Sequence, residues 1–358
     1  MSTRPRISFD ERGLCNACVW AEKKKALDWA EREVRLERLL DQHRRSDGNF
    51  DCIVPVSGGK DGSYVAHMLK SKWGMNPLSV TVKPPLATEL GETNLQAFIA
   101  SGFPHVGISP DPDAMRTLNK RGLVEMGFPY YGWLVAVTAA PIELAARFGV
   151  NLIFYGEDGE VEYGGSTETE TNPEISIDYT KRVYLEAGYE SVIGGSGLTA
   201  AQLHFFSFPD EATLTGTDIK IYNWSFFENW DPYRNYLVAK GFCGLAEADQ
   251  SNAGTFTNFA QNDQFLYALH AYLMYLKFGF GRANQDASIE VRRGAMDRDQ
   301  ALELVRIYDG QYPHEFEDLY LDYFQMSAGE FHAVLNRWTN QNLFEVNGPI
   351  RTPRFTVM

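Results

Sequence analysis

The 358-residue sequence has little of what marks membrane or exported proteins. It contains no uninterrupted apolar stretch near the roughly 20 residues that a membrane helix requires, so we expect no membrane partner. The first residues, 1–6, lead into Ile7-Ser8-Phe9-Asp10 rather than a long apolar segment, which argues against a secretory signal. Only four cysteines are present. Together these features predict a cytoplasmic protein.

Positive charge is also scarce. The chain has 33 Lys and Arg against 47 Asp and Glu, which gives a formal net charge of −14. A large negative field disfavours nonspecific binding to polyphosphate backbones, so we expect no nucleic-acid partner, although a local basic patch is compatible with this total. The hydrophobic share of 44% is ample for a packed core, and the length suggests two or three structural units.

A Walker A motif is missing as well, but another phosphate-sized loop is present. The apolar segment 51–56 runs into Ser57-Gly58-Gly59-Lys60-Asp61-Gly62-Ser63-Tyr64, and helix-compatible sequence follows. Glycines let the backbone approach an anion closely, and the N–H groups at a helix N-terminus attract phosphate. The pattern therefore predicts a strand, a phosphate-binding loop and a helix. The alternative is a plain glycine turn between strand and helix.

Strand-like and helix-like segments alternate over the next hundred residues, which predicts an α/β fold with a mainly parallel sheet covered on both faces. In such sheets ligands bind outside the C-terminal ends of the strands. We therefore expect the Ser57 loop and the segments after Val82 and Tyr155 to converge on one crevice. The predicted strands are 51–56, 78–82, 106–108 and 151–155; the predicted helices are 63–73, 93–100 and 115–148, the last broken around 127–129.

An acidic, glycine-rich stretch covers residues 157–200. A long loop at the C-terminal end of a strand is more often a binding loop or lid than a plain connection. Glu157 and Asp158, the first acidic residues after the strand, are candidate Mg²⁺ ligands. The alternative is an ordinary solvated loop.

The two ends of the chain have helical patterns and lack the strand–helix alternation of the middle. Residues 19–45 have the pattern of one charged helix, and the C-terminal third has the pattern of several helices. Asp297 and Gln300 form a candidate capping box for a helix at 301–308. We divide the chain into an N-terminal C-x-x-C segment and helix (1–47), a domain that contains the phosphate-sized loop (48–235) and a helical C-terminal region (236–358).

Cys15 and Cys18 form a C-x-x-C pair, which is half of a typical zinc site. Cys52 lies within a predicted strand and Cys243 lies far downstream, and neither belongs to a second such pair. The alternative to zinc binding is two ordinary thiols.

The Ser57 loop resembles the Ser-Gly-Gly-x-Asp-Ser signature of the PP-loop ATP pyrophosphatases, with Gly62 where the signature has serine. The resemblance implies the HUP-like fold of the adenine nucleotide alpha hydrolases and the cleavage of ATP to AMP and pyrophosphate. It also implies catalytic roles for Lys60, Asp61 and Glu157, with Mg²⁺ near Asp61. The residues it implies for ATP binding are Ser57, Gly58, Gly59, Lys60, Asp61, Gly62, Ser63, Val82 and Gly156.

Four segments, taken in order, are similar to a narrower family, the N-acetyl sugar amidotransferases: 9–18, 57–62, 230–240 and 278–294. The resemblance implies conversion of a sugar acetamido group to an acetamidino group, in the biosynthesis of pseudaminic-type sugars, flagellin glycans or lipopolysaccharide O-antigen. Members of that family commonly carry another C-x-x-C ahead of the first segment, and this sequence holds none there. Zinc at Cys15 and Cys18 therefore stays an open expectation.

Arg282, Arg292 and Arg293 are candidate ligands for a substrate carboxylate or nucleotide phosphate. The alternative for each is a surface ion pair. The source of ammonia is less evident, because Cys243 lies in a near match to a glutaminase nucleophile elbow that Leu245 breaks. We therefore expect ammonia from a separate glutaminase subunit or from solution.

Two other functions remain open at this stage. One is a tRNA thiolase or lysidine-type tRNA modifier on the same ATP-binding core. The other is a partner protein that binds nucleotide without catalysis.

Overall fold

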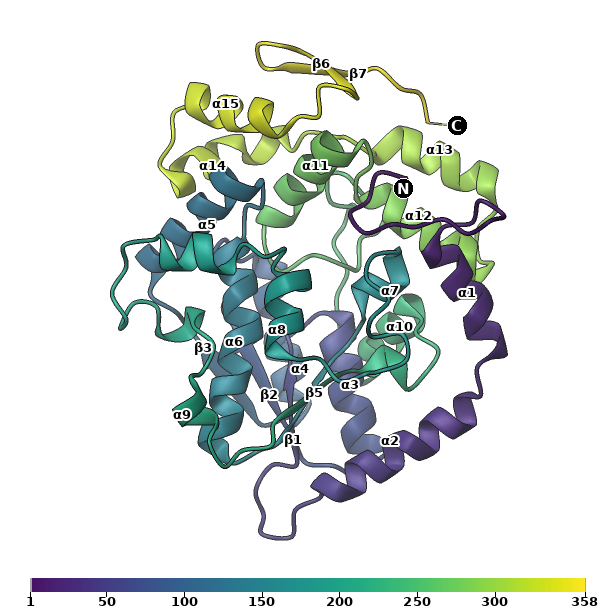
Figure 1. Cartoon of the computed structure of the whole chain (residues 1–358), viewed down its shortest axis with the longest axis vertical. Coiled ribbons are helices and arrows are strands. Elements are labelled where there is room, and N and C mark those ends of the chain that lie inside the picture. The colour runs from purple at the N-terminus through teal and green to yellow at the C-terminus, as the bar shows by residue number, and fades with distance from the viewer. Residues whose placement is uncertain (1, 358) are drawn as a thin grey trace.

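A five-stranded, all-parallel β-sheet lies at the centre of the computed structural model, which describes residues 2–357 (Figure 1). The strand order is β3-β2-β1-β4-β5, so the loop after β1 is flanked by the loops after β2 and β4. The four predicted strands are confirmed to within one residue at each end, whereas β5 was not predicted. The strands are β1 (Cys52–Pro55), β2 (Pro77–Val82), β3 (His105–Ile108), β4 (Leu152–Tyr155) and β5 (Lys220–Asn223).

Helices cover both faces of the sheet, as the alternating pattern predicts. Successive residues of a strand point to opposite faces: Cys52 and Val54 pack with one hydrophobic cluster and Ile53 with the other. The first cluster includes side chains of α2 (Trp29–His43), α3 (Lys60–Ser71), α4 (Glu89–Ala100) and α10 (Pro232–Cys243). The second includes side chains of α5 (Pro112–Met126), α6 (Tyr131–Phe148), α11 (Leu266–Phe278), α14 (Glu317–Phe324) and α15 (Ala328–Trp338).

The N-terminal segment contains two helices where the sequence predicts one. The helix α1 (Asn16–Ala26) ends before Leu27, and α2 begins at Trp29. The carboxylate of Asp28 accepts a hydrogen bond from the Glu31 amide at 2.9 Å, so it caps α2 and starts a new helix. In Figure 1 the chain ahead of α1 lies beside α12 (Arg282–Arg293), far from it in sequence.

The stretch 157–200 folds into short helices and turns that pack onto the sheet domain. Val183, Val192 and Ile193 are buried in the same cluster as α5 and α6. The Tyr131 hydroxyl donates to the Leu185 carbonyl at 2.8 Å. This part of the chain is therefore a packed layer and not a solvated loop. Its helices are α7 (Gly159–Tyr163) and α8 (Ile177–Tyr179), and α9 (Glu211–Leu214) follows before β5.

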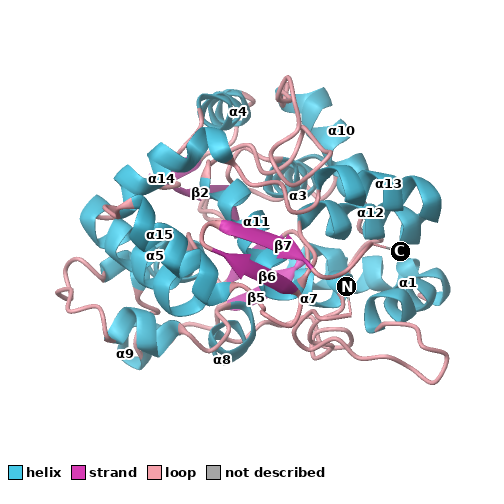
Figure 2. Ribbon diagram, turned by 90° about the horizontal axis from the view of Figure 1, so that it is seen from above, coloured by secondary structure: helices cyan, strands magenta, loops and turns pink. Residues whose placement is uncertain are grey.

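The helical C-terminal region is confirmed. The predicted boundary at residue 235 falls inside α10, which packs on α3. Asp297 and Gln300 form the predicted capping box at the start of α13 (Arg298–Tyr308). A hairpin of β6 (Phe344–Asn347) and β7 (Ile350–Pro353) follows α15 and lies over α11 when seen from above (Figure 2). None of the described helices combines the length and apolarity needed to cross a membrane.

Candidate active site

The loop after β1 leads directly into α3, with Gly59 as the N-cap residue. Gly58 has φ +83°, and a Cβ there would lie 2.4 Å from the Leu95 backbone nitrogen. A Cβ on Gly62 would lie 2.6 Å from the Pro55 carbonyl oxygen. Glycine is therefore required at Gly58 both by conformation and by the close approach of α4. At Gly62, the position where the signature has serine, the first turn of α3 packs directly against β1.

A cavity of roughly 270 Å³ opens on this loop; we call it the loop cavity. The residues after β1 and the residue Glu157 after β4 both line it, so these two segments converge as predicted. A second cavity of roughly 380 Å³, the edge cavity, lies beyond the ends of β2 and β3 and is lined by Thr81 and Lys83. Ser57, Gly91 and Asp263 line both cavities, so the two are adjacent.

Glu157 is the most perturbed carboxylate of the loop cavity. The Tyr163 hydroxyl donates to its Oε2 at 3.0 Å, whereas its buried Oε1 has no hydrogen-bond partner among the described residues. Burial, helped by the negative charge of Asp61, raises the pKa of Glu157 to about 7. A buried oxygen without a partner, beside a second carboxylate, fits a site that takes a cation.

Asp61 lies in the first turn of α3 and lines the same cavity. Its Oδ2 pairs with the ammonium group of Lys60, and its Oδ1 accepts a bond of 3.4 Å from the Asn235 amide. Gly156 separates Asp61 from the Trp230 ring: a Cβ on Gly156 would lie 3.2 Å from the Asp61 Cβ and 3.1 Å from the ring. Gly156 thus lets Asp61 approach the end of β4.

Asp158 has a different place from Glu157, although the two are neighbours in sequence. It is the N-cap residue of α7, where its Oδ1 accepts from the amides of Glu160 and Val161. The hydroxyls of Thr169 and Tyr184 also donate to its carboxylate. Since four donors occupy its oxygens and it does not line the loop cavity, Asp158 does not fit the role of Mg²⁺ ligand that the sequence suggested.

Three predicted ATP-binding residues line neither the loop cavity nor the edge cavity: Gly156, described above, Ser63 and Val82. Ser63 is fully buried in α3, and its hydroxyl has no described partner. The Val82 carbonyl accepts a bond of 3.0 Å from the Trp133 indole, while its neighbours Thr81 and Lys83 line the edge cavity. The side chain of Ser63 is therefore not directed at the loop cavity.

The three arginines predicted to bind an anion do not lie together in the structure. Arg282 lines the loop cavity and pairs with Asp286 at 2.8 Å. Arg292 donates to the Glu162 carbonyl at 3.1 Å, and Arg293 pairs with Glu290 at 2.8 Å and with Asp231. Only Arg282 of the three lines the loop cavity; the other two hold α12 against neighbouring segments.

The sequence reasoning missed several residues of the loop cavity that precede or begin α11. Asp263 lies where the loop and edge cavities meet, and burial raises its pKa to about 6. Gln261 and Tyr267 line the loop cavity as well. No local motif marks these residues. They reach the site only because the C-terminal region packs against the ends of the strands.

Cys15 and Cys18 do come together, with their Sγ atoms 3.5 Å apart. Among residues 2–357 no group of three or more His, Cys, Asp or Glu side chains is arranged to hold a metal ion. The pair therefore supplies two of the four ligands that a closed zinc site needs. Cys52 and Cys243 are buried in a hydrophobic cluster against the sheet, and neither belongs to the Cys15–Cys18 pair.

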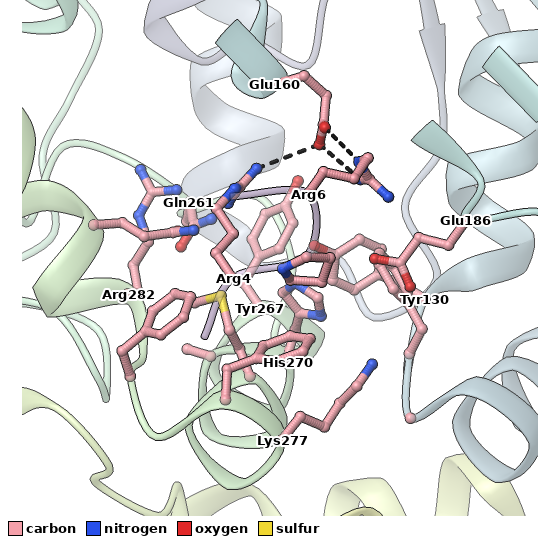
Figure 3. A pocket seen from close by; sticks show the side chains of 18 residues that line it. Arg4, Arg6, Tyr130, Glu160, Glu186, Gln261, Tyr267, His270, Lys277 and Arg282 are labelled. Atoms are coloured by element: carbon pink, nitrogen blue, oxygen red, sulfur yellow. Dashed lines mark hydrogen bonds and ion pairs between the residues drawn. The ribbon is translucent and has the colours of Figure 1, made fainter. Parts of the chain in front are cut away.

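A third cavity adjoins the loop cavity and is drawn in Figure 3. Gln261, Tyr267 and Arg282 line both. We call it the cationic cavity, because Arg4, Arg6, Lys277 and Arg282 all line it.

Comparisons with known proteins show that part of this site lies in a segment similar to a described domain family. Residues 253–355 match the model of the LPS biosynthesis protein WbpG-like C-terminal domain. That segment includes Gln261, Asp263, Tyr267 and Arg282 of the loop cavity. The C-terminal region is thus similar to a domain of lipopolysaccharide biosynthesis.

Two archaeal proteins are also similar. An uncharacterized protein of Methanocaldococcus jannaschii is 29% identical over 80 residues, and the match spans 22% of this chain and 28% of that protein. The crystal structure of a predicted tRNA methyltransferase subunit from the same organism aligns over 68% of this chain and 89% of its own, at 13% identity and a TM-score of 0.29. This alignment is too weak to support an argument about the fold, so the fold assignment depends on the parallel sheet observed in the structure.

Proposed function

We propose that this protein is a PP-loop ATP pyrophosphatase that converts the acetamido group of a sugar to an acetamidino group in bacterial surface-glycan biosynthesis. One observation carries the proposal: the glycine loop after the central strand, the Glu157 carboxylate with an oxygen that has no partner among the described residues, and the WbpG-like segment all line one cavity. The first two elements suit a nucleotide phosphate with its cation, and the third supports a role in glycan synthesis.

The residues of the loop cavity suit ATP as a substrate. The N–H groups at the start of α3 and the charges of Lys60 and Arg282 would face the phosphates. Asp61 and Glu157 are the residues that would hold Mg²⁺, which neutralises phosphate charge when bound. The edge cavity, reached past Ser57, is the space that we assign to the adenosine.

The proposed reaction has two steps. The acetamido oxygen attacks the α-phosphorus of ATP, the bond to the β-phosphate oxygen breaks, and pyrophosphate leaves. Ammonia then adds to the activated carbon, AMP departs with the former amide oxygen, and an amidine remains after loss of protons. The protein's contribution is to position the two substrates and to balance charge on the phosphates.

The test is to incubate the protein with ATP, Mg²⁺, ammonium and candidate acetamido sugars. We expect AMP and pyrophosphate by chromatography, and a sugar product lighter by the mass difference between oxygen and NH. Accumulation of ADP and phosphate would overturn the assignment to the pyrophosphatases. AMP formation with a sugar of unchanged mass would retain ATP cleavage and exclude the amidine.

A further inference from the structure

We propose that the cationic cavity binds the anionic group of the sugar substrate and that Lys277 is its principal ligand. The inference rests on the proposed function and deepens it, because it assigns the anionic group of an acetamido sugar, a carboxylate or a phosphate, to one cavity and one residue. The cavity has a volume of roughly 230 Å³ and lies next to the loop cavity.

The first reason is the charge of the residues that line the cationic cavity. Four cations, Arg4, Arg6, Lys277 and Arg282, line this cavity against two carboxylates, those of Glu160 and Glu186. The chain as a whole carries a formal charge of −14. A cavity with a surplus of cations in so acidic a protein attracts an anion locally.

The pairing of these cations is the second reason. Arg4 and Arg6 both bind Glu160, at 3.3 and 2.9 Å, and Arg282 pairs with Asp286. Lys277 pairs with no carboxylate among the side chains that the structure describes, and its ammonium group donates to the Met126 carbonyl at 3.0 Å. Figure 3 shows its side chain extending from α11 into the cavity, toward the side of Glu186.

The Lys277 ammonium group forms no direct ion pair, and the nearest counter-charge that acts on it is the Glu186 carboxylate across the same cavity. Burial lowers the pKa of Lys277, because the charged form is poorly solvated there. Two of its three N–H groups remain available after the bond to Met126. A bound carboxylate or phosphate would form a direct ion pair and accept these hydrogen bonds.

The remaining surface of the cavity suits a sugar. Phe128 and Tyr130 contact His270, with ring centroids 4.6 and 5.0 Å apart. The His270 Nδ1 is buried without a hydrogen-bond partner among the described residues. Burial lowers the pKa of His270 to about 3, so its ring is neutral near pH 7 and can bond to a ligand hydroxyl or amide. Aromatic walls with a few polar groups are typical of small-molecule sites.

The last reason is the position of the cationic cavity next to the loop cavity. Gln261, Tyr267 and Arg282 line both the cationic and the loop cavities, so ligands in the two cavities lie next to each other. A sugar anchored at Lys277 can therefore direct its acetamido group toward the phosphate loop.

The experiment measures binding by calorimetry to the full chain without ATP, with three probes. N-acetylneuraminic acid carries a carboxylate, UDP-N-acetylglucosamine carries a diphosphate, and N-acetylglucosamine is neutral. We expect at least one charged probe to bind, and the neutral probe to bind at least about tenfold more weakly. Which charged probe binds distinguishes a sugar carboxylate from a nucleotide phosphate.

Lys277→Met keeps the length of the side chain and removes its charge. We expect it to weaken binding of the charged probe by roughly tenfold to a hundredfold, and Lys277→Arg to restore most of the affinity. Lys120→Gln is the matched control, since Lys120 also donates to a backbone carbonyl, that of Gln325, away from the cavity. The Lys120→Gln variant should bind the charged probe with the affinity of the wild type.

Three results would overturn the proposal: no binding of either charged probe at millimolar concentration, equal binding of the neutral probe, or unchanged affinity in Lys277→Met. The first two use the wild type and hold even if the variant does not fold. Binding of an anion without AMP formation would reject the proposed reaction alone. AMP formation without anion binding would reject this inference alone.

Discussion

The loop cavity and the adjoining cationic cavity have walls of opposite chemistry. The wall at the end of the sheet combines backbone N–H groups with the carboxylates of Asp61 and Glu157. The wall built by the N-terminal segment and α11 carries Arg4, Arg6 and Lys277. A polyphosphate against the first wall needs a divalent cation to offset these carboxylates, in addition to Lys60 and Arg282, whereas an anion can bind the second wall without a metal ion. Dependence on a divalent ion should therefore separate the two walls.

Asp61→Ala gives the largest expected effect and removes the cation site from the first wall. Losing one essential electrostatic group at a reacting centre costs about a hundredfold or more in rate. We expect AMP formation to fall by at least that factor. Binding of a charged sugar probe should persist, because the second wall is intact.

The Asp61 side chain is partly exposed, so its removal should leave the melting temperature nearly unchanged. Asp113→Ala is the matched control, because Asp113 also lies in the first turn of a helix and pairs with a basic side chain, Arg116. A near-wild-type rate in Asp61→Ala would remove Asp61 from the mechanism.

Gly58→Ala tests the backbone of the first wall. The new Cβ would meet the backbone of Leu95, and alanine is strained at φ +83°. We expect a loss of stability on the order of 2–4 kcal/mol and loss of ATP binding, measured by denaturant unfolding and calorimetry. Gly241→Ala, in a helix with open space around the new Cβ, should be neutral or slightly stabilising. Equal stability of the two variants would contradict the close packing of the loop.

Glu157→Gln tests the charge of the first wall through pH. The unfolded chain releases the Glu157 proton near pH 4.5, whereas the folded chain holds it up to about pH 7. Folding therefore binds a proton between these values, and stability falls as pH rises from 4.5 to 7. The full effect is on the order of 3 kcal/mol above pH 7.

We expect Glu157→Gln, measured without nucleotide or metal, to unfold at higher denaturant than the wild type at pH 8 and to differ little at pH 4. At pH 8, Mg²⁺ with ATP should stabilise the wild type more than the variant. A variant less stable than the wild type at pH 8 would show that the carboxylate is already paired in the free protein.

The first wall was predictable and the second was not, for a physical reason. The strand, glycine pair and helix that form the loop are contiguous in sequence, and parallel strands bring Glu157 to the same edge. Arg4 and Lys277 meet only through tertiary packing, with no local pattern. The unpredicted β5 is a four-residue strand whose role is set by pairing with β4.

The structure also places apart residues to which the sequence analysis assigned the same role. Arg282 begins α12 and Arg292 nearly ends it, so the two lie about 15 Å apart along the helix. They cannot serve one anion. Asp158 follows Glu157 directly, yet it caps α7, and the Asp-Gly-Glu sequence after the strand is a capping signal that could have been recognised.

Cys243→Ser should have the smallest effect, because Cys243 belongs to neither wall. Its thiol is buried in α10 and donates to the Ala239 carbonyl at 3.1 Å. Burial raises the pKa of the Cys243 thiol, which disfavours the reactive thiolate. Gly244 is the C-cap of α10 with φ +70°, so this segment is a helix end and not the strand-to-helix turn of a nucleophile elbow.

We therefore expect the isolated protein to form amidine from ammonium and not from glutamine, with an unchanged ammonium-driven rate in Cys243→Ser. The two nitrogen sources are compared by mass spectrometry of the sugar. A separate glutaminase subunit, which we propose as the natural source of ammonia, should restore the use of glutamine. If the lone protein consumes glutamine and Cys243→Ser stops it, then Cys243 is a nucleophile and the protein has a second reactive site outside the two cavities.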